Sequence, residues 1–282
     1  MVSSLDCGGR LLSLHRPQVM GILNVTPDSF SDGGRFIGAS AAVEHAVSMQ
    51  AAGAGIIDIG GESTRPGSTG VSVQEELDRV IPVIEALKDS VDLPLSVDTS
   101  KPEVMTAAAA AGAGLINDVM ALRRPGSLEA ARDTGLPVCL MHMQGTPATM
   151  QDNPVYDDVV TEVAAFLRAR RDAAREAGIP VSRLLLDPGF GFGKRDPHNA
   201  QLLAGLPVIC ELGCPVLTSL SRKSLVGRVL GRAMPDRLAG SIALATLASW
   251  QGASIVRAHD VAETVDAVNL MEYVHAHGGN DQ

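Results

Sequence analysis

Three polar residues at or near the ends of apolar segments have the right chemistry to bind a small planar ligand. Asp98 lies in LPLSVDT, Asn117 in GLINDV and Asp187 in LLLDPG. A carboxylate pairs bidentately with adjacent N–H donors, and a buried carboxylate needs such a partner. Two carboxylates and an amide therefore predict a pocket for a heterocycle with an amidine or amino-amide edge. The alternative is a structural salt bridge to Lys223, which explains one aspartate more easily than two.

A second group of residues predicts an anion site. The segment SRKS supplies Lys223 and Ser224, RAHD supplies Arg257 and His259, and Asn24 ends an earlier apolar segment. Ser224 is expected to open a helix, whose N-terminus favours negative charge. These groups together suit a phosphate or diphosphate.

Arg222 and Arg257 also have a structural alternative, in which each pairs with surface carboxylates. That alternative is more plausible for Arg222 than for Arg257, which is placed at a strand end.

Asn24 and Asp28 are candidate ligands for a hard cation. Mg²⁺ usually takes few protein oxygens and completes its coordination with water and substrate phosphates. The alternative is that both residues only form a turn, which is a common use of Asn and Asp.

The candidate site residues are far apart in the sequence, so strands and helices must bring them together. Eight short apolar segments between Met20 and Asp260 each end in a polar or charged residue, and segments with helical spacing separate them. When buried parallel strands alternate with helices, all the strand ends meet on one face, as in a (β/α)₈ TIM barrel of class α/β. Phosphate commonly binds there at the last two strand-to-helix loops, which are SRKS and RAHD here. An open doubly wound sheet would instead gather its polar residues at one switch point.

The length of 282 residues suits one barrel domain. We expect a hairpin or strap in residues 1–17, the barrel in residues 18–277 and a flexible tail in residues 278–282. The loops TPDSFSDGGRFIG and GGESTRPGSTGVS are long for their position and are candidate lids. Ser40 is the predicted N-cap of the helix after the first loop, and Gly53 its predicted C-cap.

Composition narrows the function classes. A net charge of −9 and 3% aromatic residues argue against a nucleic-acid partner. The N-terminus lacks a signal pattern, and no apolar segment approaches the length needed to cross a membrane. We interpret all four cysteines as free thiols in a reducing compartment, and expect a cytoplasmic protein: Cys7, Cys139, Cys210 and Cys214.

Two further features allow more than one interpretation. In GFGFGKR the Gly193-Lys194 pair is followed by Arg195, so the phosphate-binding P-loop pattern fails. Its glycines either let the backbone approach a flat ligand or form a turn. His142 could act as a base, but a packed histidine at a strand end is the favoured interpretation.

The motifs as a set resemble the dihydropteroate synthase family over nearly the whole chain. They are GILNVTPDSFSDGG, DIGGESTRPGS, SVDTSKPEV, INDV, CLMHMQG, LLLDPGFGFGK, SRKS and RAHDV, in the family's order. The resemblance implies condensation of a 6-hydroxymethyl-7,8-dihydropterin diphosphate with p-aminobenzoate. The expected products are 7,8-dihydropteroate and diphosphate, and sulfonamides would compete with p-aminobenzoate.

The resemblance also implies residue roles. The pterin would be held by Asp98, Asn117, Met141, Asp187, Phe192 and Lys223. The diphosphate would be held by Asn24, Arg257 and His259, and Mg²⁺ by Asn24 and Asp28. The p-aminobenzoate site would comprise Phe30, Thr64, Arg65, Pro66, Lys223 and Ser224. The catalytic set would be Asp98, Asp187, Lys223, Asn24, Asp28, Arg257 and His259.

The chemistry of these residues fits a dissociative path. Cations stabilise a departing diphosphate, and carboxylates stabilise the pterin cation that remains. Two alternatives stay open: a folate-binding methyltransferase relative, which would not need the cationic loops, and a catalytically silent homologue. The resemblance further implies a homodimer formed through the C-terminal helices. A weak apolar stripe there is consistent with it: Ile242, Ala243, Ala245, Thr246 and Leu247.

Overall fold

The computed structural model describes residues 2–25, 35–64, 67–68, 70–146 and 149–278. Its main sheet contains eight parallel strands in the order β8-β7-β6-β5-β4-β3-β10-β9. Their bounds are β3 Gln18–Asn24, β4 Ile56–Gly60, β5 Leu95–Asp98, β6 Leu115–Asp118, β7 Val138–Met141, β8 Leu184–Asp187, β9 Leu217–Thr218 and β10 Ile255–Ala258. A parallel bridge between Leu186 and Val216 brings the two edge strands together. The predicted (β/α)₈ barrel is therefore confirmed.

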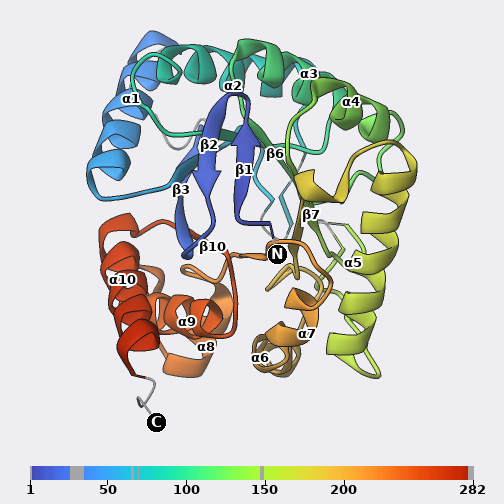
Figure 1. The fold of residues 1–282 in the computed structure, drawn as a ribbon, viewed down its shortest axis with the longest axis vertical. Helices are drawn as coiled ribbons and strands as arrows, with labels where there is room; N and C mark the ends of the chain where they lie inside the picture. Colours follow the sequence, from blue (N-terminus) through green and yellow to red (C-terminus); the bar gives the residue numbers. More distant parts are fainter. Residues whose placement is uncertain (1, 26–34, 65–66, 69, 147–148, 279–282) are drawn as a thin grey trace.

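Helices follow the strands and surround the barrel (Figure 1). Their bounds are α1 Arg35–Ala51, α2 Val73–Leu87, α3 Pro102–Ala111, α4 Ser127–Thr134, α5 Val159–Glu176, α6 Asp196–Ala204, α7 Leu206–Cys210, α8 Ser224–Leu230, α9 Leu238–Trp250 and α10 Val261–His277. Short 3₁₀ turns span Val181–Arg183 and Met234–Asp236.

Helix ends follow local sequence rules in several places. Ser72 caps α2 through a reciprocal capping box with Glu75, and Pro102 stands at the start of α3, where a missing N–H costs nothing. The predicted start of α1 at Ser40 is wrong, because the helix begins at Arg35. The segment before Ser40 contains no proline, so the helix can extend towards the first loop.

The N-terminal segment forms an antiparallel hairpin of β1 (Ser4–Cys7) and β2 (Arg10–Ser13). In Figure 1 these two strands lie in front of the barrel strands, across one end of the barrel. Leu5, Cys7 and Leu12 are buried against the first inward-facing residues of the barrel strands, which are Met20, Ile56, Leu115, Cys139, Leu185, Leu217 and Ile255. The hairpin therefore closes the floor of the barrel, and the opposite end, where the strands finish, is left as the mouth.

Alternation along the strands separates the two faces of the sheet. Outward residues such as Ile57, Val97 and Ile116 pack against the helices in the largest apolar cluster. Inward residues change from apolar at the floor to polar at the mouth on β6, β8 and β10, where Leu115, Leu185 and Ile255 are followed by Asn117, Asp187 and Arg257. This change positions the site. Residues 279–282, most of the expected tail, lie outside the described residues.

Candidate active site

The three ligand-binding candidates from the sequence lie together at the mouth. Asp98 pairs in register with Asn117 on the neighbouring strand, and Asp187 pairs with Met141. The side chains of Asp98, Asn117 and Asp187 are buried, with 8%, 4% and 3% of their surface exposed. They share the inward face of their strands, so they converge inside the barrel and do not form separate surface ion pairs.

Sequence reasoning missed a fourth polar residue in this interior, Asp58. It lies in the middle of β4 and is fully buried. Its Oδ2 accepts hydrogen bonds from Asn117 Nδ2 at 3.1 Å and from Arg257 Nε at 2.6 Å. Its Oδ1 has no hydrogen-bond partner within the described part of the chain. The available signal was an aspartate inside the apolar strand IIDIG, because an internal strand carboxylate must find a partner.

Arg257 lies inside the barrel mouth and contacts two carboxylates. Besides its bond to Asp58, its Nη2 donates to Asp98 Oδ2 at 3.1 Å. The side chain is only 16% exposed. The sequence placed Arg257 in a cationic loop with surface pairing as the alternative, whereas the structure joins it to the interior carboxylates. The guanidinium expected to hold the diphosphate therefore contacts Asp98, which is expected to hold the pterin.

Burial shifts the protonation equilibria of the mouth residues. It raises the pKa of Asp98 to about 8; the Arg257 charge opposes this shift and the Asp58 charge adds to it. Burial also raises the pKa of Asp187 to about 6, against the Gly189 N–H bond at 2.7 Å and the Lys223 charge. Perturbed carboxyls of this kind in a concave site are typical of functional residues.

Lys223 occupies the N-cap position of α8, immediately before Ser224. Burial lowers the pKa of its ammonium to about 8, opposed by the Asp187 charge. Its Nζ lies 4.3 Å from the centre of the Phe192 ring, within the range of a cation–π contact. Phe192 and Met141 are buried in one small apolar cluster. A flat ring and a cation thus stand near the carboxyl group of Asp187.

The glycine-rich segment after β8 forms a tight turn. Gly189 has φ +67°, and a Cβ there would lie 1.9 Å from the carbonyl oxygen of His142. A side chain at this position is therefore excluded by both conformation and space. The turn keeps Phe192 beside Lys223.

His142 and Lys194 support this turn from within the structure. Lys194 is 1% exposed, and its Nζ contacts His142 Nδ1 at 2.8 Å and donates to the carbonyls of Gly189 and Phe192. Burial lowers the pKa of His142 to about 2 and that of Lys194 to about 7. A histidine that stays neutral and packs edge-on against Phe166 is a structural residue. This agrees with the favoured sequence interpretation.

The loops after β9 and β10 contact one another at the mouth. Ser221 Oγ lies 3.0 Å from His259 Nδ1 and accepts from the His259 backbone N–H at 3.1 Å. Arg222 forms an ion pair with Asp260 across the same two loops. The structural alternative is therefore realised for Arg222, and its guanidinium helps to join the loops.

The remaining predicted residues are distributed around this mouth. Asn24 is exposed at the end of β3, Thr64 is half-buried after β4, and Ser224 opens α8. Asp28, Phe30, Arg65 and Pro66 lie outside the described residues. Among residues 2–25, 35–64, 67–68, 70–146 and 149–278, no three His, Cys, Asp or Glu side chains gather as a metal site.

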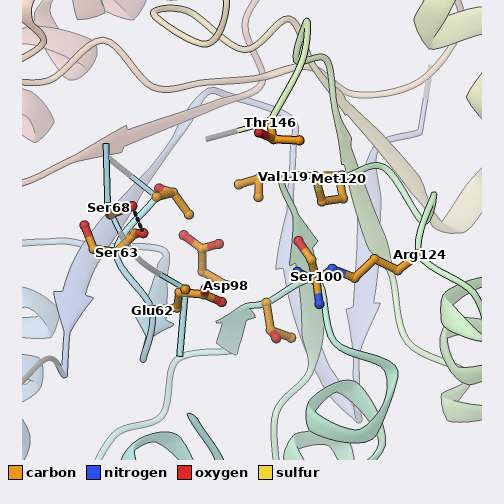
Figure 2. A pocket seen from close by; sticks show the side chains of 12 residues that line it. Glu62, Ser63, Ser68, Asp98, Ser100, Val119, Met120, Arg124 and Thr146 are labelled. Carbon is orange, nitrogen blue, oxygen red and sulfur yellow. Dashed lines mark hydrogen bonds between the residues drawn. The ribbon is translucent and has the colours of Figure 1, made fainter. Parts of the chain in front are cut away.

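A cavity of about 190 Å³ opens beside Asp98 at the mouth. We call the segment GGESTRPGSTGVS, which follows β4, the second loop. Figure 2 shows its residues Glu62, Ser63 and Ser68 on one side of the cavity, and Val119, Met120 and Arg124 on the other. The second loop therefore forms a wall of the space next to the buried carboxylates.

Comparisons with known proteins show the family of this chain. Residues 20–259 match the pterin binding enzyme family. The chain is 55% identical over 264 residues to dihydropteroate synthase of Escherichia coli K12, covering 94% of each chain. A Xanthomonas albilineans dihydropteroate synthase solved with 4-aminobenzoic acid has a TM-score of 0.93 and 58% identity, covering 98% of this chain and 99% of that one.

A Yersinia pestis dihydropteroate synthase solved as a sulfonamide drug complex has a TM-score of 0.92 and 55% identity, covering 97% and 99% of the two chains. The chain therefore belongs to the pterin binding enzyme family and, within that family, to the dihydropteroate synthases, which are transferases.

Proposed function

We propose that this chain binds a 6-hydroxymethyl-7,8-dihydropterin diphosphate at the mouth of the barrel and transfers its pterin-methyl group to p-aminobenzoate. The observation that carries this proposal is the convergence of Asp98, Asn117 and Asp187 on one buried face next to Lys223. A Xanthomonas albilineans relative has been solved with 7,8-dihydropteroate, which is the expected product.

The buried carboxylates would recognise the pterin ring. Asp187 presents both of its oxygens, one of which also accepts from Gly189, and Asp98 presents a carboxyl group that is shared with Arg257. The N–H donors of a pterin would replace the water that these groups lack when buried. Phe192 and Met141 would contact the ring faces, and Lys223 would reach the ring edge over Phe192.

Arg257, His259 and Asn24 would hold the diphosphate. Arg257 stands next to Asp98, and His259 is held by Ser221 at the neighbouring loop. A guanidinium binds phosphate oxygens through several parallel N–H bonds. The anion would therefore lie beside the pterin carboxylates, as a substrate that carries both groups requires.

Mg²⁺ is the proposed cofactor, and the donor set fits it. Asn24 offers one exposed amide oxygen at the mouth, which suits an ion that takes most of its ligands from water and phosphate. Asn24 and Asp28 would hold the ion. When bound, Mg²⁺ supplies positive charge that stabilises the diphosphate as a leaving group.

We propose a dissociative reaction. The bond between the pterin CH₂ and the diphosphate oxygen breaks first, and the electron pair leaves with the diphosphate. Asp187, and Asp98 when it is deprotonated, stabilise the cation that remains on the pterin. The amine nitrogen of p-aminobenzoate then forms the new C–N bond and releases one proton. No covalent bond to the protein is needed, so the residues act by positioning and by charge.

The p-aminobenzoate site is proposed to lie between the second loop and α8. Thr64 lines the cavity beside Asp98, and Lys223 and Ser224 stand at the start of α8. Phe30, Arg65 and Pro66 are the further expected contacts. Relatives solved with 4-aminobenzoic acid and with a sulfonamide drug support p-aminobenzoate as a substrate. Sulfonamides are expected to compete with p-aminobenzoate here.

A homodimer through the C-terminal helices is also proposed. Large apolar side chains are exposed on α9 and α10, including Leu247, Trp250, Leu270 and Tyr273. The stripe expected from the sequence needs one change, since Ala245 faces inward and is buried whereas Leu247 and Trp250 face outward. Apolar area of this kind is typical of a surface that packs against a partner.

A cytoplasmic location is proposed because all four cysteines are free thiols. Within the described residues, no helix is both long and apolar enough to cross a membrane.

Diphosphate release tests the proposed reaction. Purified protein would be given the pterin diphosphate and Mg²⁺, with and without p-aminobenzoate. We expect sustained release and formation of dihydropteroate with p-aminobenzoate, and slow release without it. No release in either condition, despite measurable pterin binding, would contradict the proposal and favour a silent homologue or a methyl-transfer relative.

A further inference from the structure

A buried group of three charges lies behind the second loop, outside the residues assigned to substrate. Lys101 is 4% exposed and follows β5 at the N-cap position of α3. Its Nζ forms ion pairs with Glu62 Oε2 at 2.6 Å and with Glu76 Oε2. Glu76 is fully buried in the first turn of α2. Lys101 therefore joins the strand that carries Asp98 to the second loop and to α2.

Glu62 uses both carboxylate oxygens. Oε2 contacts Lys101, and Oε1 accepts the backbone N–H of Val71 at 3.2 Å. A Cβ at Gly70 would lie 2.9 Å from Oε1, so the glycine allows this close approach. Glu62 thus connects the start of the second loop to Val71 near its end, and the ion pair with Lys101 holds the Glu62 side chain in position.

The held segment faces the cavity at the mouth. Ser63 and Ser68 are joined by a hydrogen bond from Ser68 Oγ to the Ser63 carbonyl at 2.6 Å, drawn as a dashed line in Figure 2. Glu62, Ser63 and Thr64 line the same cavity as Asp98. The position of Thr64 at the mouth therefore depends on the base of the loop, where Glu62 is anchored.

The positive charge of Lys101 balances the negative charges of Glu62 and Glu76. Two carboxylates share one ammonium that is almost fully buried, so removal of that ammonium leaves two like charges facing one another without a counter-charge. Glu76 belongs to a packed helix and cannot leave easily, whereas Glu62 belongs to a loop and is half-buried. The loop is therefore the part that would move.

We propose that Lys101 is a positioning residue for the use of p-aminobenzoate: it anchors Glu62, and through Glu62 it keeps the second loop at the mouth next to Asp98. This inference rests on the proposed function, because Thr64 belongs to the proposed p-aminobenzoate site. Lys101 itself touches no substrate.

The test uses Lys101→Met, which keeps the length of the side chain and removes the charge. We expect the KM for p-aminobenzoate to rise roughly 10- to 100-fold, because misplacement of a substrate-positioning group by about 1 Å has effects of this size. The Kd for the pterin diphosphate should stay within about twofold, since this change leaves the contacts of Asp187 and Lys223 intact. An equal loss of affinity for both substrates would overturn the proposal.

Lys194→Met is the matched control, because Lys194 is an equally buried lysine at the other side of the mouth. Its contacts support the turn that carries Phe192, so its effect should fall on pterin binding and not on the KM for p-aminobenzoate. If both lysine variants raise the KM for p-aminobenzoate equally, loss of a buried lysine is the general cause and the proposal fails.

Glu62→Gln is a second variant for the case in which Lys101→Met does not fold. It should raise the same KM, and combination with Lys101→Met should add little, because both changes break one connection. Fully additive effects would overturn the proposed path through Glu62.

Hydrogen exchange separates this proposal from the proposed function. The Val71 amide should exchange at least about tenfold faster in Lys101→Met, whether or not the protein makes dihydropteroate. Unchanged exchange would show that Lys101 does not hold the loop. An inactive wild-type protein with faster exchange in the variant would contradict the proposed reaction while supporting the anchor. Faster exchange with an unchanged KM in an active enzyme would overturn the link to p-aminobenzoate.

Discussion

The floor and the mouth of the barrel use the same strands for opposite purposes. Leu185 faces inward at the floor and packs under the hairpin, and Asp187, two residues later on β8, faces inward at the mouth. Leu115 and Asn117 repeat this relation on β6. Two residues advance a strand by about 6.6 Å without changing the face. On β6 and β8, a step of two residues therefore separates the apolar packing that supports the fold from the polar groups proposed to bind the ligand.

The floor and the mouth also differ in the sign of the free-energy change when their side chains are buried. Floor residues gain free energy by burial, because Leu5 and Leu12 of the hairpin complete an apolar cluster. Mouth residues lose free energy by burial, and they recover it only through partners such as the bond between Arg257 and Asp58. Mutations should therefore lower stability at the floor and lower activity at the mouth.

Asp187→Ala should have the largest effect on activity. A pterin would lose two charge-assisted hydrogen bonds, each worth on the order of 1.5–3 kcal/mol, so affinity should fall roughly 10²- to 10⁴-fold. Calorimetric titration with the pterin diphosphate measures this change. Unchanged pterin affinity would refute the assignment of Asp187.

Leu185→Ala is the floor counterpart on the same strand. Truncation of a fully buried leucine should lower the free energy of unfolding by about 2–5 kcal/mol, because it removes apolar burial and leaves a cavity. Chemical denaturation measures the stability, and steady-state kinetics should give wild-type KM values at a temperature where the variant is folded. A selective loss of pterin affinity would break the division between floor and mouth.

A pH dependence should appear at the mouth. The pKa of Asp187 is about 6, so protonation below that pH should remove its ability to accept pterin N–H bonds. Any loss of kcat/KM for the pterin diphosphate between pH 8 and pH 6 belongs to Asp98, whose pKa is about 8. A further fall of up to about tenfold per pH unit below 6 belongs to Asp187. A profile that stays level down to pH 5 would contradict this role.

The raised pKa of Asp187 affects stability in the opposite direction: a lower pH should weaken pterin binding but stabilise the folded state. Since the folded pKa of Asp187 is raised above its ordinary value of 3.8, its protonation favours the folded state. This contribution is fully present below pH 3.8 and is lost as the pH rises through about 6. Asp187→Asn should therefore reduce the slope of stability against pH between those values, which thermal unfolding at several pH values would show.

Arg222→Ala should have the smallest effect. Its ion pair with Asp260 is partly solvated, with the arginine side chain 40% exposed, so the loss should be below about 1 kcal/mol. Thermal unfolding and the two KM values should stay close to wild type. A large loss of diphosphate affinity would show that Arg222 belongs to the anion site and would enlarge the functional part of the mouth.

Much of the site could be predicted because the local sequence shows which residues lie at the ends of strands. Asp98, Asn117 and Asp187 follow apolar segments, and the barrel brings such ends to one face. Asp58 was missed because it lies within an apolar strand and no local pattern indicates its partners. The partners of Arg257 were also missed, since Asp58 and Asp98 are distant in sequence.

The sequence by itself determined the alternation of strands and helices, the polar strand ends and the family motifs. These features are local: they depend on apolar spacing, on glycine and proline, and on the order of residues along one segment. The tertiary structure decided which charges share a partner. Lys101 meets Glu62 and Glu76, and Arg257 meets Asp58, because closure of the barrel brings distant segments into a water-poor interior. Burial strengthens such pairs and makes an unpaired charge costly, so the partners are set by the fold.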